Sequence, residues 1–543
     1  MRNFSSYGPI NTKLNYYAPR KRLIQYAYER LTGQNFEEGG HYITVWAPRQ
    51  TGKTWIMQQV MQKIKDSGEF DVGIVSMQSG KTITTDADIL DLFVKKLNKW
   101  FKKDLPAVNS WQNLSDLFVK KYFKKPVILI LDEFDALGED FINKFANEFR
   151  DMYLDRQNES EKPSEKKACL LHSLALIGVR SVLGIEDVTG SPFNVQRSLH
   201  ISNLTFEEVK KMFAWCEKES DQKIEPEVVK NVFRETQGQP GLTCWFGELL
   251  TEGFSDNRMK KDDHITMKNF KKIYTAATDL LPNNNILNII SKAKQKPYNE
   301  TVFELFRTDE KMPFRYDDPD LNFLYLNGVI GHEEINNRFY AKFSCPFIQK
   351  RLFNYFANRL FRYMGTLREP FEDLSCVISE NSLNIKKLMR RHEAHLKKNR
   401  KWLLKDAPRR KDMKIFEAVY HFNLFRYLSD FFGDRARVWP EFPTGNGQVD
   451  IVIEYGTQVY GLEIKSYTDE TGYKQGIEQA ARYGKQLGLA EVFLILFVEY
   501  VDDRNRKKYE QEKIDDKTGV QVIAVFVETG KWDMDFDSSG GSA

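Results

Sequence analysis

The sequence predicts a multidomain α/β protein, and three observations lead to this fold class. Its 543 residues exceed what one hydrophobic core organises, so roughly three or four domains are expected. Over the first 200 residues, short apolar runs alternate with helical patterns, which is typical of a parallel sheet covered by helices on both faces. A second α/β pattern begins at residue 413, after a mainly helical middle region.

The composition narrows the class of protein further. A hydrophobic share of 41% and a charged share of 29% are ordinary for a globular chain. No apolar run approaches the roughly 20 residues of a membrane span, so no membrane partner is expected. Residues 1–15 lack the apolar core of a secretory signal, and the five scattered cysteines form no CxxC pair. We therefore expect reduced thiols, no zinc site and a cytoplasmic location.

The first 204 residues carry the elements of the predicted parallel sheet. Strands are expected at 41–48, 70–77, 127–132 and 174–179, and helices at 20–31 and from the end of the first strand to 66. The polar stretch 155–167 predicts a mobile loop.

The middle of the chain reads as helical. Thr205 and Glu208 form a capping box that opens this region, and residues 238–241 (GQPG) separate two helices. Further on, a helix at 321–330 leads into a strand, a turn at 333–337 and a return strand at 338–343. This order suggests a winged helix, with a generic helical packing domain as the alternative.

Residues 47–54 (APRQTGKT) follow the first strand and predict a phosphate-binding P-loop. Gly52 permits close backbone approach, the Lys53 ammonium reaches the β- and γ-phosphates of ATP or ADP, and the Thr54 hydroxyl ligates Mg²⁺. Ala47 replaces the usual first glycine, which is acceptable if that position keeps a negative φ. The other residues expected around the phosphates are Arg49, Gln50 and Thr51.

The strand at 127–132 predicts the partner of this loop. Asp132 ends the strand, where ligands bind outside the carboxyl ends of parallel strands, and is expected to hold Mg²⁺ in its outer sphere. Glu133 is placed to orient or deprotonate the attacking water. The alternative is a buried strand that ends in a solvated acidic turn.

APRQTGKT, residues 130–135 (ILDEFD), residues 178–180 (GVR) and GQPG together resemble the STAND class of AAA-related ATPases over about residues 10–365. The resemblance implies that Arg180 is a sensor contacting the γ-phosphate. It also implies that Pro240 belongs to the motif by which a helical lid reads nucleotide state. The activity implied is a switch with slow hydrolysis, an ADP-bound resting state and ATP-bound homo-oligomers that respond to a protein or nucleic-acid trigger.

A second constellation lies near the C-terminus. Asp450 follows the turn at 444–447 and opens a strand, and Glu463 and Lys465 share one face of the next strand. Phosphodiester hydrolysis needs carboxylates that hold Mg²⁺, and Lys465 would orient the water or steady the phosphate. The backbone carbonyl of Ile464 is a further expected ligand.

Glu417 on the preceding helix is a candidate third carboxylate, and Gln479 and Tyr483 lie one helical turn apart after the second strand. The ordered set resembles the PD-(D/E)xK nucleases, and QxxxY resembles their RecB-like branch, over about residues 413–530. The alternative is a degenerate copy of the fold used only for binding.

The run 386–411 is strongly basic. It predicts either a helical arm that neutralises phosphates or simply a solvated helix face.

The patterns divide the chain into six segments: 1–204 (P-loop ATPase domain), 205–281 (helical lid), 282–365 (winged-helix-like domain), 366–412 (basic helical linker), 413–537 (restriction-endonuclease-like α/β domain) and 538–543 (an appended tail). The function expected is an ATP-regulated, Mg²⁺-dependent nuclease, with DNA preferred over RNA, in prokaryotic defence or mobile-element biology. The alternatives are a non-catalytic STAND signalling or DNA-binding ATPase, and a DNA-repair motor.

Overall fold

The computed structural model describes residues 2–33, 39–178, 196–254, 257–258, 264–306, 311–369, 372–440 and 450–530. The chain forms two compact units. The first comprises Met1–Lys292 and Phe314–Gly331, and the second comprises Ala293–Pro313 and His332–Ala543. None of the helices in the described residues is both long and apolar enough to cross a membrane.

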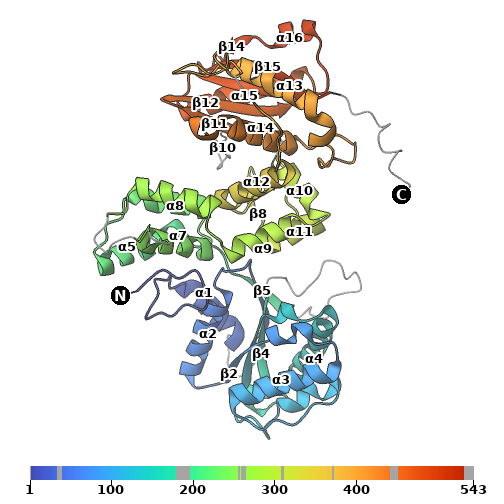
Figure 1. Cartoon of the computed structure of the whole chain (residues 1–543). Helices are drawn as coiled ribbons and strands as arrows, with labels where there is room; N and C mark the ends of the chain where they lie inside the picture. Colours follow the sequence, from blue (N-terminus) through green and yellow to red (C-terminus); the bar gives the residue numbers. More distant parts are fainter. Residues whose placement is uncertain are drawn as a thin grey trace. The chain divides into compact units, whose positions relative to one another are not determined.

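The first unit is built on a parallel sheet, as the sequence predicts, but the sheet has a fifth strand that was not predicted (Figure 1). Its strand order is β2-β3-β4-β1-β5, so β4 separates β1 from β3. The strands are β1 (Tyr42–Trp46), β2 (Asp71–Ser76), β3 (Val127–Asp132), β4 (Leu171–Gly178) and β5 (Gln196–His200).

Helices cover both faces of this sheet because its strands are apolar on both sides. Ile128 and Ile130 of β3 pack with α1 (Lys21–Thr32) and α2 (Lys53–Ser67). Their neighbours Val127, Leu129 and Leu131 pack with α3 (Asp86–Phe101) and α4 (Glu139–Asn158) on the opposite face (Figure 1).

The stretch 155–167 is not the mobile loop that its polarity predicts. Helix α4 extends to Asn158, and Arg156 and Lys167 are 3% and 1% exposed. Arg156 Nη2 donates to Ser164 Oγ at 2.5 Å, and Ser164 Oγ lies 2.7 Å from His172 Nδ1. Burial lowers the pKa of His172 to about 3, so its ring is neutral. Polar side chains that satisfy one another can be buried, which the prediction did not allow for.

A helical region follows the sheet within the first unit. Thr205 forms the predicted capping box with Glu208 at the start of α5. The elements are α5 (Phe206–Ser220), α6 (Pro226–Thr236), α7 (Pro240–Glu252), β6 (Gly253–Phe254), β7 (Asn257–Arg258), α8 (Met267–Asp279), α9 (Asn284–Ala293) and α11 (Pro319–Leu326).

The second unit begins with α10 (Tyr298–Leu305), a hairpin of β8 (Ile330–Ile335) and β9 (Arg338–Phe343), and α12 (Pro346–Leu360). Asn336 and Asn337 form the turn, with φ of 51° and 60°. Asparagine tolerates this left-handed conformation, and a two-residue turn of this kind matches the twist of paired strands. The turn is therefore shorter than the predicted 333–337.

A six-stranded mixed sheet organises the rest of the second unit, in the order β10-β11-β12-β13-β15-β14. The strands are β10 (Arg437–Pro440), β11 (Ile451–Tyr455), β12 (Gln458–Ser466), β13 (Glu491–Val498), β14 (Glu512–Ile514) and β15 (Gln521–Glu528), and the helices are α13 (Ile385–Leu403), α14 (Glu417–Phe432), α15 (Glu470–Leu487) and α16 (Asp503–Tyr509). From residue 413 the sequence predicts the order helix, strand, strand, helix, strand, strand, which leaves out β10, β14 and α16.

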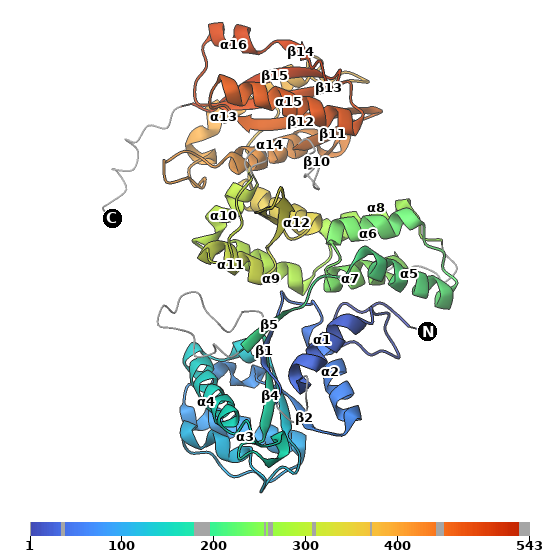
Figure 2. The ribbon, with the colours of Figure 1, turned by 180° about the vertical axis from the view of Figure 1, so that it is seen from behind.

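Opposite faces of this sheet carry different helices. Helix α15 packs on the face that presents Leu494 and Leu496 of β13 (Figure 2). The adjacent Phe497 points the other way, toward Tyr420 of α14 and His392 of α13. An aromatic cluster joins α14 to the start of the unit, because Phe422 contacts Phe303 of α10 and Phe356 of α12.

Candidate functional site

A buried cluster of acidic residues lies around the carboxyl-terminal half of β12 in the six-stranded sheet. Asp450, Glu463 and Glu417 are 5%, 0% and 6% exposed, and Lys465 is 6% exposed. Asp450 Oδ2 accepts a hydrogen bond from the Ile464 backbone N–H at 2.7 Å. Glu417 Oε2 accepts one from the Ser466 N–H at 2.8 Å. The structure therefore brings together the carboxylates that the sequence singles out, although Glu417 and Asp450 lie 33 residues apart in the sequence.

Glu463 is the most buried acid of this cluster, at 0% exposed. Lys465 Nζ lies 3.4 Å from its Oε1, yet neither carboxylate oxygen accepts a hydrogen bond. Burial raises the pKa of Glu463 well above its usual range, the charge of Asp450 raises it further, and Lys465 opposes both effects. A divalent cation would remove this penalty, since it compensates buried negative charge.

The oxygen atoms present suit Mg²⁺, which prefers carboxylates, carbonyls and water. The described residues hold no group of three or more His, Cys, Asp or Glu side chains arranged around one point. A Mg²⁺ ligand set of Asp450 and Glu463, completed by the Ile464 carbonyl and water, stays a prediction.

His421 belongs to the cluster and was missed by sequence reasoning. It lies one helical turn after Glu417, with Nε2 4.0 Å from Glu417 Oε1 and Nδ1 4.0 Å from Asp450 Oδ1. Its i, i+4 spacing from Glu417 was a usable signal, because such residues share one helix face.

Gln479 and Tyr483 also reach this cluster. Gln479 Nε2 donates to the Tyr483 hydroxyl at 2.8 Å, and both side chains are buried. Burial raises the pKa of Tyr483 to about 12, and Glu463 and Asp450 add to the rise. The phenol therefore stays protonated and can donate toward the acids.

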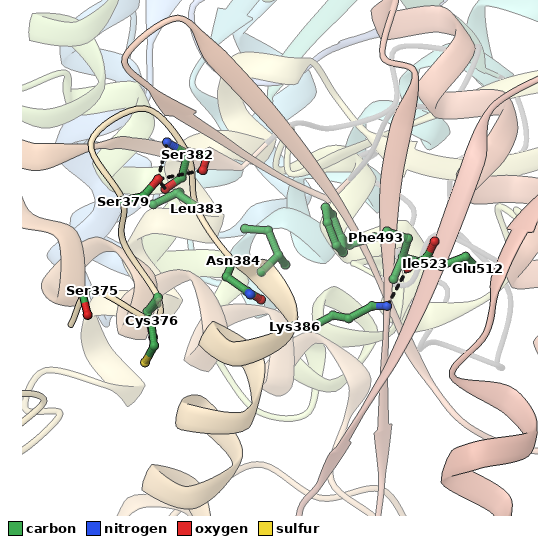
Figure 3. Close-up of a pocket in the computed structure, with 12 residues that line it drawn as sticks. Ser375, Cys376, Ser379, Ser382, Leu383, Asn384, Lys386, Phe493, Glu512 and Ile523 are labelled. Atoms are coloured by element: carbon green, nitrogen blue, oxygen red, sulfur yellow. Dashed lines mark hydrogen bonds and ion pairs between the residues drawn. The ribbon is translucent and has the colours of Figure 1, made fainter. Parts of the chain in front are cut away.

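The basic run on α13 does not stand free of the protein. Its apolar face is buried, including Leu388 and Leu396. Lys386 pairs with Glu512 at 2.9 Å, beside a cavity of about 410 Å³ that also contains Cys376 and Phe493 (Figure 3). Further ion pairs join Arg390 to Glu510, Arg391 to Glu372, and Lys397 to Glu393 and Glu528. Much of the charge in the first half of the helix is thus already neutralised.

The predicted P-loop joins β1 to α2 and lines a cavity of about 970 Å³. Gly52 has φ of 87°, where a Cβ would be strained, and α2 begins at the next residue. Ala47 keeps a negative φ, the condition set for its replacement of glycine. The helix N-terminus supplies free N–H groups and a positive dipole end, which suit phosphate.

Thr54 lies on α2, just after β1, and contacts Asp132 at the end of β3. The contact forms although β4 lies between β1 and β3. Thr54 Oγ1 donates to Asp132 Oδ2 at 2.8 Å, and the Glu133 N–H donates to Asp132 Oδ1 at 3.0 Å. Burial raises the pKa of Asp132 despite these two hydrogen bonds. Burial also raises the pKa of Glu133, with Asp132 contributing, and Ser76 Oγ donates to Glu133 Oε2 at 3.4 Å.

Lys53 points along the loop. Its Nζ donates to the carbonyls of Ala47 at 2.6 Å and Pro48 at 2.8 Å. Burial lowers the pKa of Lys53 to about 8, while Asp135 and Asp132 act in the opposite direction.

The residues 238–241 contact the P-loop backbone. The Gly241 N–H donates to the Gln50 carbonyl at 3.0 Å, and Gln239 Nε2 donates to the Arg49 carbonyl at 3.1 Å. Pro240 is the first residue of α7. Arg180 and the turn at 444–447 lie outside the described residues.

Residues 6–252, which include the P-loop and the contacts made by α7, match the family model described as the AAA-like domain. Residues 6–252 of the first unit are therefore similar to the AAA-like domain. An ATPase of the AAA or P-loop class is therefore supported. No curated protein matches the sequence.

Several solved structures are similar over part of the chain. They include the Walker-type ATPase PABY2304 of Pyrococcus abyssi, at 12% identity over 64% of this chain and 99% of that chain, with a TM-score of 0.38. The Aeropyrum pernix ORC1 protein, solved in complex with DNA, is 13% identical over 63% and 94%, with a TM-score of 0.31. The Thermotoga maritima RuvB Holliday junction branch migration motor is 12% identical over 60% and 92%, with a TM-score of 0.33.

The cavity next to the P-loop is lined by residues that sequence reasoning did not find. Asp135 lines it, and a Cβ at Gly178 would lie 3.0 Å from the Asp135 Cγ. Asp135 had a signal, since it ends the acidic run ILDEFD. Trp55 and Gln58 lie just after the P-loop, and Ala136 and Ile177 lie beside other predicted motifs. The lining residues from more distant segments had no signal: Gly8, Pro9, Ile10, Gln78, Lys81, Asn288, Lys292 and Asn327.

Proposed function

We propose that this protein is an ATP-regulated, Mg²⁺-dependent nuclease that cuts nucleic acid, with DNA preferred over RNA. The observation that carries the proposal is the convergence of Asp450, Glu463 and Lys465 in one buried cluster, where both oxygens of Glu463 lack a hydrogen bond. A buried carboxylate left in this way is costly unless it serves a ligand.

In the AAA-like domain, each polar residue has a defined task in the proposal. Lys53 would exchange its two carbonyl partners for the β- and γ-phosphates of ATP. Thr54 and Asp132, already joined at 2.8 Å, would hold Mg²⁺. Glu133 would orient the attacking water, and its raised pKa helps it to accept a proton.

In the second unit, Asp450, Glu463 and the Ile464 carbonyl would hold Mg²⁺. The bound ion would supply Lewis-acid stabilisation of the scissile phosphate and lower the pKa of water. Lys465, whose ammonium lies beside Glu463, would orient that water or neutralise the phosphate. Tyr483, fixed by Gln479, would donate a hydrogen bond at the rim of the cluster.

The proposal also covers the helices after the sheet, the β8–β9 hairpin and the oligomeric state. The helices after the sheet would act as a lid that reads nucleotide state through Gln239, Pro240 and Gly241, supported by their contacts with the P-loop. The β8–β9 hairpin with its flanking helices would be a winged helix. ATP would favour a homo-oligomer, and a role in prokaryotic defence rests on the analogy with STAND proteins.

The test is a cleavage assay with purified protein, Mg²⁺, and single- and double-stranded DNA and RNA, with and without ATP. We expect at least one nucleic acid to be cut, cutting to stop on chelation, and Asp450→Asn to be inactive. If the parent cuts none of the four substrates, or if Asp450→Asn cuts at the parental rate, the nuclease proposal is wrong.

A further inference from the structure

Two aromatic rings lie together on the surface of the second unit. Tyr363 follows α12, and Trp402 lies in the last turn of α13; their ring centroids are 5.8 Å apart with an interplanar angle of 35°. Tyr363 is 72% exposed and Trp402 is 44% exposed. Among the large hydrophobic side chains of the described residues, Tyr363 is the most exposed. Single exposed hydrophobic side chains are common, but here two aromatic rings are exposed in contact with each other.

The rings are held in place rather than loosely attached. Trp402 Nε1 donates to Asn399 Oδ1 at 3.2 Å on the same helix. Gly365, with φ of 75°, packs against the indole, and a Cβ there would lie 3.2 Å from Trp402 Cζ2. The indole N–H is therefore satisfied within the protein, and what remains available is ring surface. A preorganised ring pair loses little entropy when a flat partner binds.

The two chain segments that carry the rings contain basic but no acidic residues. No Asp or Glu occurs from residue 336 to 368 or from 394 to 405, the two segments that carry the rings. Exposed cations on these segments include Arg362, Lys398, Lys401 and Lys405. In the same stretch of α13, Lys397 pairs with Glu393 and Glu528. A partner with negative charge and flat apolar rings fits such a surface.

The ring pair and the acidic cluster both lie toward the carboxyl ends of the parallel strands β12, β13 and β15. Helix α13 runs along β15, from Lys386 beside Glu512 to Lys397 beside Glu528. Beyond that strand, a Cβ at Gly530 would lie 2.8 Å from Arg400 Nη1. Strands β12, β13 and β15 are parallel, so Ser466, which binds Glu417, lies at these carboxyl ends too. The rings and the carboxylates therefore lie toward the same ends of these strands.

We propose that Tyr363 and Trp402 form a base-stacking site for single-stranded nucleic acid. Unpaired bases expose the flat faces that stack on aromatic side chains, and the surrounding cations match the phosphates between them. Bases within a duplex are already stacked on one another, so a duplex is a poorer ligand for this surface. The inference deepens the proposed nuclease function, because it names the form of nucleic acid that this unit takes.

The test measures binding of a fluorescein-labelled oligothymidylate of roughly 16 nucleotides by anisotropy, in EDTA so that no cutting occurs. We expect Tyr363→Ala and Trp402→Ala each to weaken binding roughly 5- to 100-fold. Trp402→Phe should keep most of the affinity because it keeps a ring. The matched control is Tyr26→Ala, which removes a tyrosine that is 41% exposed in the other unit, and it should bind like the parent.

Two ligand controls separate stacking from charge. Inorganic polyphosphate carries phosphates without bases, so its affinity should not change in either alanine variant. The salt dependence of oligothymidylate binding should keep its slope, because no phosphate contact is removed. The inference is overturned if both alanine variants bind the oligothymidylate like the parent, if polyphosphate binding falls equally, or if the parent binds duplex DNA more tightly.

Failure of this inference is distinguishable from failure of the nuclease proposal, because binding in EDTA needs no chemistry. A parent that binds through the rings yet never cuts with Mg²⁺ would overturn the nuclease proposal alone. A parent that cuts with Mg²⁺ while both ring variants bind normally would overturn the stacking site alone.

Discussion

The backbone N–H of Gly241 donates to the carbonyl of Gln50 at 3.0 Å, across 191 residues of sequence. Gln50 lies in the P-loop with φ of 57°, a conformation that non-glycine residues rarely adopt. The first turn of α7 therefore contacts the loop residue that has this left-handed backbone conformation. A change in the conformation of the loop on phosphate binding would therefore alter its hydrogen bond with α7 directly.

Gly241→Ala tests this contact. A Cβ at Gly241 would lie 2.6 Å from the Gln50 Cβ, so the helix and the loop must move apart. We expect ATP affinity and the steady-state hydrolysis rate to fall several-fold, with both sheets still folded. Gly138→Ala is the control, because its Cβ would meet only Phe141 at 3.9 Å. Equal ATP affinity and turnover in the two variants would show that the contact does not matter.

The pKa of Lys53, lowered to about 8 by burial, predicts a pH dependence of ATP binding. Phosphates favour the charged ammonium, so binding must raise this pKa, and free protein above pH 8 must first take up a proton. Affinity should therefore be highest below pH 8 and fall by up to about tenfold per pH unit above it. Calorimetric titrations at pH 7, 8 and 9 check this. Lys53→Arg, which stays charged, should give a flat profile if it binds; constant affinity in the parent would contradict the assignment.

Glu133→Gln should separate ATP binding from hydrolysis. The variant keeps Lys53, Thr54 and Asp132, so affinity for ATP should stay close to the parental value. Loss of a general base typically slows a reaction roughly 10²- to 10⁴-fold. Phosphate release under saturating ATP measures this effect, and size-exclusion chromatography with ATP would reveal any trapped assembly. Parental turnover in the variant would remove Glu133 from the mechanism.

Asp450→Asn and Lys465→Ala should both abolish cutting and spare ATP hydrolysis. Asparagine can still accept the hydrogen bond from the Ile464 N–H, which an alanine would leave buried and unsatisfied at a cost of about 1–3 kcal/mol. Asp450→Asn should weaken Mg²⁺ binding, whereas Lys465→Ala should not, because lysine is no metal ligand. Calorimetry with Mg²⁺ alone gives this comparison. If both variants cut normally, the acidic cluster is not the nuclease centre.

The double variant Lys398→Glu/Lys401→Glu should weaken nucleic-acid binding and reduce its salt dependence. Each lost phosphate contact should lower the slope of log affinity against log salt by roughly 0.7–0.9. Lys397→Glu is the informative comparison, since Lys397 already pairs with Glu393 and Glu528. It should mainly lower the unfolding temperature. An unchanged slope in the double variant would return the run 386–411 to an ordinary solvated face.

The sequence predicted the features that depend on strand periodicity and strand ends. Thr54 and Asp132 were placed together because parallel strands end at one edge, and they lie 2.8 Å apart. Glu463 and Lys465 were placed on one face by the two-residue period, and their charged atoms lie 3.4 Å apart. In both sites the backbone pattern fixes where the side chains go, so local sequence was sufficient.

Features that depend on distant partners were not predictable. The stretch 155–167 looked solvated, yet Arg156 and Lys167 are buried because Ser164 and backbone carbonyls receive their N–H groups. The charge of α13 gave no sign that Glu510 and Glu528, more than a hundred residues away, would neutralise part of it. Composition reports which charges exist, but only the fold decides which of them meet.

The two units interleave along the chain, with a consequence for protein engineering. Residues Phe314–Gly331 belong to the first unit but are flanked on both sides by parts of the second, so no single cut separates the two. A fragment starting at residue 413 would also strip Phe303 and Phe356 from Phe422 on α14, the helix that begins with Glu417. In such a fragment Phe422 would be exposed to solvent, and the helix that positions the Glu417 carboxylate would lose part of its packing. A fragment starting at residue 413 is therefore poorly suited to fusion with other proteins.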